Sequence, residues 1–173
     1  QGGREPSEIH IDISRERLGP VLGQALDSVP HAIGINSHRG SLLTRHPVHI
    51  QWLMEEISTY GSLFFIDSFT HHDSVALQVA EETGVPAMRR NVFLDPDPSP
   101  ETVAREFARM KRLATQRGQV IAIGHPYPST LELLERELPG LADEGIELVP
   151  ISDLISVPEA GSERVEPVIH SAL

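Results

Sequence analysis

The stretch QVIAIGHPYPSTLELL, residues 119–134, indicates most clearly which fold this chain adopts. It opens with a short apolar run, rich in β-branched residues and ending at Gly124, which is typical of a buried strand. A histidine and two prolines follow, and the residues after them have helical spacing. A helix is therefore predicted to begin near Ser129, with Ser129 and Glu132 as its capping box. A strand that turns directly into a helix is one half of a βαβ unit.

The same alternation of short apolar runs and capped helices recurs along the chain. It predicts strands near residues 31–36, 62–66, 90–94, 119–124 and 146–149. The spacing of about 30 residues is that of one βαβ unit, and the runs contain few polar residues, as in sheets that are buried on both faces. The pattern therefore predicts an α/β fold with a parallel sheet, either open or curved into part of a barrel.

Domain boundaries follow from where this periodicity starts and stops. A chain of 173 residues is long enough for one domain with its own core. We expect an extended N-terminal segment at 1–12, the α/β domain at 13–156 and a loosely ordered tail at 157–173. In that tail the sequence PEAGSERVEP has no hydrophobic period.

Composition argues against several classes of partner. The net charge of −11 and the pI near 5.2 oppose binding to phosphate backbones, so no nucleic-acid partner is expected. The chain has no cysteine, which excludes disulfides and thiolate metal sites. No apolar run reaches the length of a membrane span, so membrane insertion is not expected either.

Polar residues of the kinds that functional sites use are concentrated at the predicted strand ends. In parallel α/β folds the carboxyl ends of all strands open on one rim, where the loops can carry chemistry. We therefore expect one rim to hold these side chains. They are Asn36, His38, Ser41, Asp67, Asp95, His125 and Tyr127.

Some of these residues also have a purely structural interpretation. His38 is equally compatible with a turn histidine bonded to nearby backbone, and Asp67 with a cap for the following turn. His125 is harder to explain in this way, because a surface loop does not need a histidine fixed between Gly124 and Pro126. We therefore favour a functional role for His125.

Several motifs, taken in order, resemble those of the divergent polysaccharide deacetylase family. The resemblance covers residues 13–156 and implies an α/β fold whose parallel sheet forms part of a distorted (β/α) barrel of the polysaccharide deacetylase type. The segments that carry it are GINSHRGSLLT (34–44), LFFIDSFT (63–70), GVPAMRRNVFLD (84–95), IAIGHPYPSTLELL (121–134) and GIELVPISDLI (145–155).

This resemblance implies an enzyme that removes N-acetyl or O-acetyl groups from a cell-envelope polysaccharide by metal-assisted attack of water. A divalent metal, zinc in related enzymes, is the implied cofactor, and His38 is the implied metal-site residue. His125 is the implied proton donor to the departing amine, and Asp67 is the rim carboxylate expected to partner it. The implied substrate-binding residues are Asn36, Ser41, Arg90, Asp95 and Tyr127.

The chain departs from the family pattern in ways that bear on activity. Ser37, Arg39 and Asn91 stand where family members usually have asparagine, methionine and aspartate. The family's upstream motifs are an acidic pair after an apolar run and a histidine beside proline, methionine and glutamate. Neither occurs in this chain. We therefore expect weak or no zinc binding by this chain alone.

Three explanations for the missing upstream motifs stay open: a natural short relative, a processed or excised fragment, or a numbering that conceals a missing portion. In each case an edge of the parallel sheet is available for pairing. The resemblance also implies a polysaccharide or amino-sugar oligomer as partner and a periplasmic or extracytoplasmic location. The alternative function is a non-catalytic envelope domain that keeps the rim for binding sugar or protein.

Overall fold

A computed structural model describes residues 9–37 and 42–155 of the chain. Its strands are β1 (Gly34–Asn36), β2 (Phe64–Asp67), β3 (Ala87–Arg89), β4 (Val92–Phe93) and β5 (Ala122–Ile123). Its α-helices are α1 (Arg15–Asp27), α2 (Pro47–Ser58), α3 (Ala76–Thr83), α4 (Pro100–Arg117), α5 (Pro128–Glu137) and the short α6 (Ile151–Leu154). Three 3-10 turns, η1 (Leu43–Arg45), η2 (Leu138–Gly140) and η3 (Ala142–Glu144), complete the described elements.

All strand pairs in this structure are parallel. β1, β2 and β3 form one sheet in that order, and β4 pairs with β5 in a second. The segment between β3 and β4 joins the two sheets. The Arg90 amide donates to the Asp67 carbonyl at 2.9 Å on one side, and the Asn91 amide donates to the Ile121 carbonyl at 2.8 Å on the other. The predicted α/β fold with a parallel sheet is confirmed, and the strands of the described residues do not close into a barrel.

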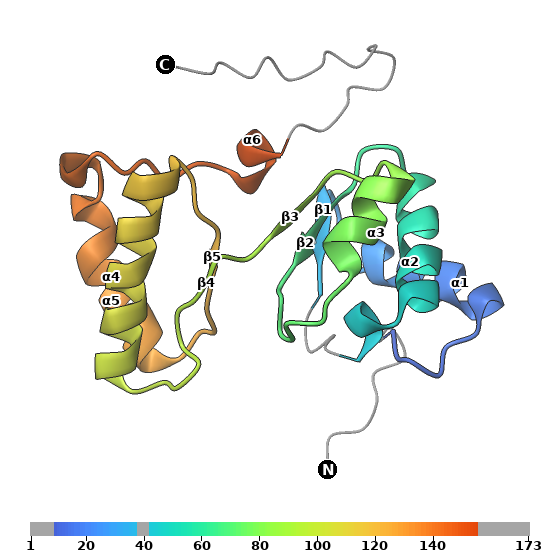
Figure 1. Cartoon of the computed structure of the whole chain (residues 1–173), viewed down its shortest axis with the longest axis horizontal. Coiled ribbons are helices and arrows are strands. Elements are labelled where there is room, and N and C mark those ends of the chain that lie inside the picture. Colours follow the sequence, from blue (N-terminus) through green and yellow to red (C-terminus); the bar gives the residue numbers. More distant parts are fainter. Residues whose placement is uncertain (1–8, 38–41, 156–173) are drawn as a thin grey trace.

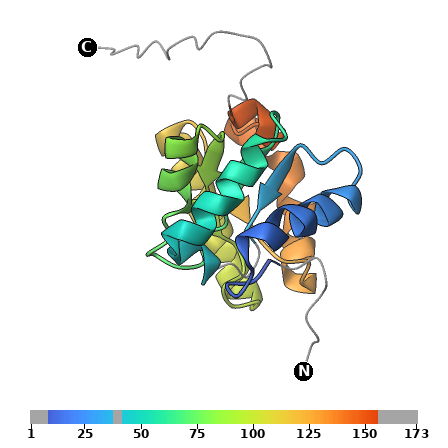
Figure 2. The same ribbon diagram turned by 90° about the vertical axis from the view of Figure 1, so that its right-hand side faces the viewer.

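The helices form two groups, one for each sheet. Figure 1 shows α1, α2 and α3 beside β1–β3, and α4 and α5 beside β4 and β5. Figure 2 turns the first group toward the viewer, and α1 and α2 lie in front of the strands there. Because β3 runs on into β4, the two groups are connected through the extended segment that contains Arg90 and Asn91.

Each group of helices buries its own core, and a third cluster joins them. Side chains alternate between the two faces of a strand, so Phe65 of β2 packs with the α1–α3 core while Phe64 and Ile66 face the other way. These two residues pack with Ile121 and with Ile155, which directly follows α6. The third cluster therefore fixes β2 relative to β5, and with them the loops at their carboxyl ends.

The helix ends follow the sequence signals. α3 and α4 end at Gly84 and Gly118, which have φ angles of 74° and 77°, a left-handed conformation that glycine adopts without strain. α4 begins with Ser99 as N-cap and Pro100 in its first turn, as predicted. None of the helices in the described part of the chain is long and apolar enough to cross a membrane.

Two strand predictions need correction. Residues 146–150 have no regular secondary structure, so the predicted strand at 146–149 is wrong. This apolar segment lines a cavity of about 530 Å³ beside β5 and does not pair with it. The predicted strand at 90–94 is shorter than expected, since only β4 (Val92–Phe93) pairs with β5, and the residues just before this range form the separate strand β3 of the first sheet.

Two predicted element starts are also displaced. β1 starts at Gly34, three residues later than predicted, and the preceding His31 has a left-handed φ of 65° that no strand accommodates. The predicted capping box of Ser129 and Glu132 is wrong. α5 begins one residue earlier, after Tyr127 as N-cap, and the Ser129 hydroxyl donates to the Pro98 carbonyl at 2.6 Å.

Candidate functional site

A cavity of about 270 Å³ lies where the carboxyl ends of β1, β2, β4 and β5 meet. The helices pack beside the two sheets, whereas the loops at this rim carry polar residues. Residues from strands far apart in the sequence therefore face one space. The described residues that line it are Asn36, Ser37, Ser68, Thr70, Arg90, Phe93, Ile123 and His125.

His125 is held by Asp95, whose side chain is fully buried. Asp95 Oδ1 lies 2.9 Å from His125 Nδ1, and Asp95 Oδ2 accepts from the His125 amide at 2.6 Å. The hydroxyl of Thr130 donates to the same Oδ2 at 2.9 Å. A carboxylate beside Nδ1 orients the ring and favours a proton on Nδ1. Because Nδ1 is turned to Asp95, Nε2 lies on the opposite side of a ring that is 37% exposed.

The glycine before the histidine makes room for this carboxylate. A Cβ atom on Gly124 would lie 3.1 Å from Asp95 Oδ2 and 3.3 Å from both Leu94 Cβ and Thr130 Cγ2. Such distances are shorter than ordinary van der Waals contacts. The glycine in the GHP sequence therefore lets a buried carboxylate approach the backbone of the histidine.

Two aromatic rings flank the imidazole. Phe93 meets it edge-on with the ring centroids 5.5 Å apart, and Tyr127 lies at 5.4 Å with a tilted ring. Phe93 also lines the cavity, whereas Tyr127 is not among the described residues that line it. These contacts limit the motion of the His125 ring beyond what Asp95 alone would do.

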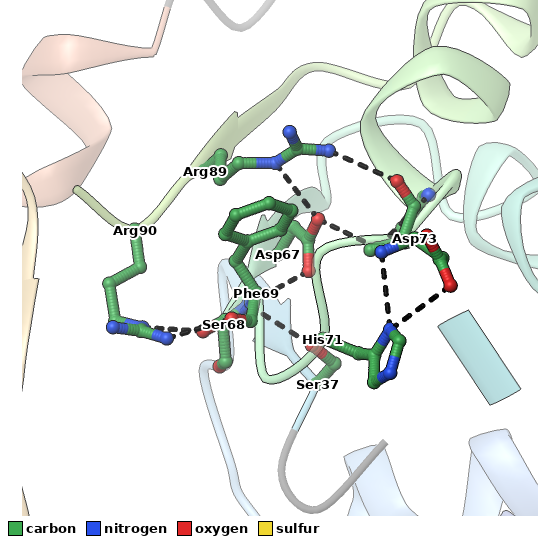
Figure 3. Close-up of polar contacts among 10 residues, drawn as sticks. Ser37, Asp67, Ser68, Phe69, His71, Asp73, Arg89 and Arg90 are labelled. Atoms are coloured by element: carbon green, nitrogen blue, oxygen red, sulfur yellow. Dashed lines mark hydrogen bonds and ion pairs between the residues drawn. The ribbon is translucent and has the colours of Figure 1, made fainter. Parts of the chain in front are cut away.

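Asp67 is also fully buried, and it organises the loop after β2 (Figure 3). Its Oδ1 accepts from the Phe69 amide at 2.8 Å, and its Oδ2 accepts from Ser74 Oγ at 2.9 Å and from Arg89 Nε at 3.2 Å. Phe69 has a left-handed φ of 47°, which is strained for a bulky residue, and these bonds hold it there. The expected pairing of Asp67 with His125 is therefore wrong, because Asp95 takes that place.

Arg90 reaches from the segment between the two sheets to the same loop. Its Nε donates to the Ser68 carbonyl and its Nη2 donates to the Phe69 carbonyl at 2.8 Å (Figure 3). Its guanidinium lies 4.8 Å from the centre of the Phe93 ring. Burial lowers the pKa of Arg90, and the charge of nearby Asp67 partly offsets that effect. An arginine shifted downward from so high a value still carries its positive charge at neutral pH.

The ends of β1 and β2 are tied together at the cavity wall. Asn36 Nδ2 donates to Ser68 Oγ at 3.3 Å, and the Ser68 amide donates to Ser37 Oγ at 3.1 Å. Ser37, which replaces the usual asparagine of the family pattern, thus has a structural bond. His38 and Ser41, the predicted metal-site residue and one predicted substrate-binding residue, lie outside the described residues.

Comparison with known proteins identifies the family. The family model of divergent polysaccharide deacetylases matches residues 1–155. The chain belongs to this family. The uncharacterized protein YibQ of Escherichia coli K12 is 34% identical over 155 residues, which are 90% of this chain and 48% of YibQ. An uncharacterized protein of Haemophilus influenzae Rd is 35% identical over 150 residues, which are 87% of this chain and 53% of that protein.

A solved structure supports the fold. The crystal structure of the uncharacterized protein ATU2773 from Agrobacterium tumefaciens C58 matches with a TM-score of 0.79 at 18% identity. The match covers 83% of this chain and 58% of that one. The chain spans about half the length of the curated relatives that it matches. The chain therefore shares its family with two uncharacterized proteins and its fold with a third.

The described residues around the cavity do not by themselves fit the zinc ion that the deacetylase family implies. A zinc site needs several nitrogen or oxygen ligands that converge on one point. Both oxygens of Asp67 and of Asp95 already accept hydrogen bonds within the protein. In the described ranges, the ligand atoms of three side chains, His71, His72 and Asp73, lie within 4.8 Å of one another, in the loop after β2.

Four residues that shape the site were not predicted from the sequence: Ser68, Arg89, Phe93 and Thr130. Strand register would have found Arg89, because β2 and β3 pair Asp67 directly with it. Register also explains Asp95: the alignment that pairs Val92 with Ala122 and Phe93 with Ile123 places Asp95 opposite His125. Ser68 and Thr130 carry no comparable signal, because their roles depend on how two loops pack.

Proposed function

We propose that this domain takes part in removing acetyl groups from a cell-envelope polysaccharide, with His125 as the proton donor to the leaving group. The observation that supports this proposal is the Asp95–His125 pair at a cavity on the rim of a parallel sheet. Family membership favours a carbohydrate as the substrate. The reaction adds water across the acetyl linkage and yields acetate and a free amine, or an alcohol where the acetyl group is an ester.

The chemistry that the pair offers is proton transfer. An amine leaves an amide carbon readily only when its nitrogen is protonated as the bond breaks, and histidine can exchange a proton near neutral pH. With Nδ1 turned to Asp95, the proton passes through Nε2. Asp95 holds the ring in one orientation while the proton is given up and taken back. General acid catalysis of this kind contributes roughly 10²–10⁴-fold in rate.

Family membership implies a divalent metal as the group that would activate the attacking water. Such a metal, when bound, would lower the pKa of its water and polarise the acetyl carbonyl. His38 is the proposed ligand from this chain. Because no three potential ligands of the described residues converge at the cavity, we expect zinc binding by this chain alone to be weak or absent. We also propose a periplasmic or extracytoplasmic location.

A second candidate function is non-catalytic binding of sugar at the same rim. The observation that favours it is that, among the described residues, no three potential metal ligands converge at the cavity. Two departures from the family pattern have structural bonds: Ser37 Oγ accepts from Ser68, and Asn91 Oδ1 accepts from the Ile121 amide at 2.8 Å. A binding domain would keep these contacts without any need for a proton donor.

His125→Asn distinguishes the two functions. Zinc is added in large excess, because this chain alone is expected to bind it weakly; under that condition we expect the unmodified chain to release acetate from N-acetylglucosamine oligomers and the variant to release at least about tenfold less, because the proton donor is lost. The melting temperature should change little. His31→Asn is the matched control, since His31 is exposed and its left-handed φ suits asparagine.

Equal acetate release by the unmodified chain and the His125→Asn variant would contradict the role of His125. Binding of the oligomers without any acetate release, in the unmodified chain, would instead support the non-catalytic function. Acetate release and oligomer binding are therefore both measured for each protein.

A further inference from the structure

The charges that face the cavity have the opposite sign to the chain as a whole. The chain carries a net charge of −11, yet the described residues that line the cavity include one arginine and one histidine and no carboxylate. The two nearby carboxylates, Asp67 and Asp95, are fully buried behind the wall. Asp67 forms an ion pair with Arg89, and Asp95 lies against the His125 ring. Arg90 is therefore the permanently charged side chain among the described residues that line the cavity, and its charge is opposite in sign to that of the whole chain.

Arg90 supplies the permanent charge of this site. Its hydrogen bonds go to the carbonyls of Ser68 and Phe69, which satisfy N–H groups but carry no net charge. Across residues 9–37 and 42–155, no carboxylate lies within 4.0 Å of its guanidinium. Burial lowers the pKa of Arg90, which shows that water compensates its charge poorly. An anion in the cavity would compensate the positive charge of Arg90.

The remaining donors of Arg90 have the right form for a carboxylate. Nε and one N–H of Nη2 point to the loop, so Nη1 and the other N–H of Nη2 form the second side of the planar fork, which has no hydrogen-bond partner within residues 9–37 and 42–155. That geometry matches the two oxygens of a carboxylate. One permanent positive charge balances a monoanion better than a dianionic phosphate. A cavity of about 270 Å³ is small for a ligand pocket and suits a single ring.

We propose that the cavity binds a carboxylated sugar, with Arg90 as the residue that selects the carboxylate. The sugar part of this proposal rests on the proposed function. Phe93 contacts both Arg90 and the His125 ring, so a carboxylate at Arg90 lies on the same side of the cavity as the proton donor. Asn36 and Ser37, which also line the cavity, supply neutral hydrogen-bonding groups for hydroxyls. The substrate class is therefore an acidic polysaccharide.

The test compares glucose with glucuronic acid, which differ only in the group at carbon 6. Binding to the full chain is measured by amide chemical-shift titration. We expect glucuronic acid to bind about tenfold more tightly than glucose, the factor of one charge-assisted pair. That preference should weaken as salt is raised. Arg90→Gln should abolish it, and Arg90→Lys, which keeps the charge without the fork, should retain part of it.

Arg112→Gln is the matched control, because it removes one positive charge from the exposed side of α4. This variant should keep the preference for glucuronic acid. If Arg90→Gln does not fold, the salt-dependent difference between the two sugars on the unmodified chain decides the matter. Equal affinity for both sugars, or no response to either, overturns the proposal.

The proposed deacetylation is tested separately on neutral N-acetylglucosamine oligomers. A preference for glucuronic acid without acetate release would support the carboxylate site and contradict deacetylation. Acetate release without any such preference would support deacetylation and overturn the role given to Arg90. The two proposals therefore fail independently.

Discussion

Asp95 holds His125 through both the ring and the backbone, with Oδ1 on Nδ1 and Oδ2 on the amide. This double contact depends on the missing side chain at Gly124, which lets the carboxylate lie against the strand end. The arrangement is sensitive to small displacements, since a buried carboxylate that loses a hydrogen bond has no water to replace it. Residue 124 is thus as much a part of the site as residue 125.

Gly124→Ala tests this dependence. The new methyl group would lie 3.1 Å from Asp95 Oδ2, so we expect the free energy of unfolding to fall by about 1–3 kcal/mol through overpacking. Urea denaturation measures the change. Gly140→Ala is the control, because a Cβ there meets nothing within 4 Å. Equal stability of the two variants would show that Gly124 is not needed for close approach.

At the level of elements, the segment from β3 to β4 determines where the rim residues lie. It leaves the first sheet after Arg89 and enters the second at Val92. Asn91, between them, is hydrogen-bonded to Ile121. The Asn91 amide donates to the Ile121 carbonyl, and its side-chain Oδ1 accepts from the Ile121 amide at 2.8 Å. Asn91 therefore links the two sheets at the base of β5.

Asn91→Ala should destabilise the fold. Removing Oδ1 leaves the amide of buried Ile121 without its acceptor, at a cost of about 1–3 kcal/mol in the free energy of unfolding. Asn91→Asp is the matched control, because it keeps an oxygen at the same place and matches the usual family residue. Urea denaturation of both variants measures the effect. An alanine variant as stable as the aspartate variant would contradict this role.

Local signals explain which elements could be predicted from the sequence. The ends of α3 and α4 follow from Gly84 and Gly118, and the start of α4 follows from Ser99 and Pro100, because caps act within one turn. The absence of a strand at 146–149 could not be predicted in the same way. The apolar residues of this segment are compatible with a strand, but a strand also needs a paired neighbour.

Local sequence signals could not identify the partner of His125 either. Asp67 and Asp95 both follow apolar runs, so their surroundings in the sequence are alike. Only the strand order separates them: β4 lies beside β5, whereas β2 lies between β1 and β3. The rim residues could be named from the chain, but their pairing required the sheet topology.

At the scale of the whole molecule, the cavity belongs to both groups of elements. Asn36 and Ser68 come from the sheet covered by α1–α3, and Phe93 and His125 come from the sheet that packs with α4 and α5. The cluster of Phe64, Ile66, Ile121 and Ile155 keeps these two sheets in contact. A site built across two cores responds to changes in either, so its geometry reports on the packing of the entire domain.

Asp95 fixes the orientation of the His125 ring in the folded domain, with Nδ1 toward the carboxylate and Nε2 on the opposite side. Imidazole ¹⁵N NMR of the unmodified chain tests it most directly. Because Asp95 lies beside Nδ1, we expect neutral His125 to carry its proton on Nδ1, and we expect Asp95→Ala to remove this preference. A proton on Nε2 in the unmodified chain, or a His125 spectrum that Asp95→Ala leaves unchanged, would contradict it.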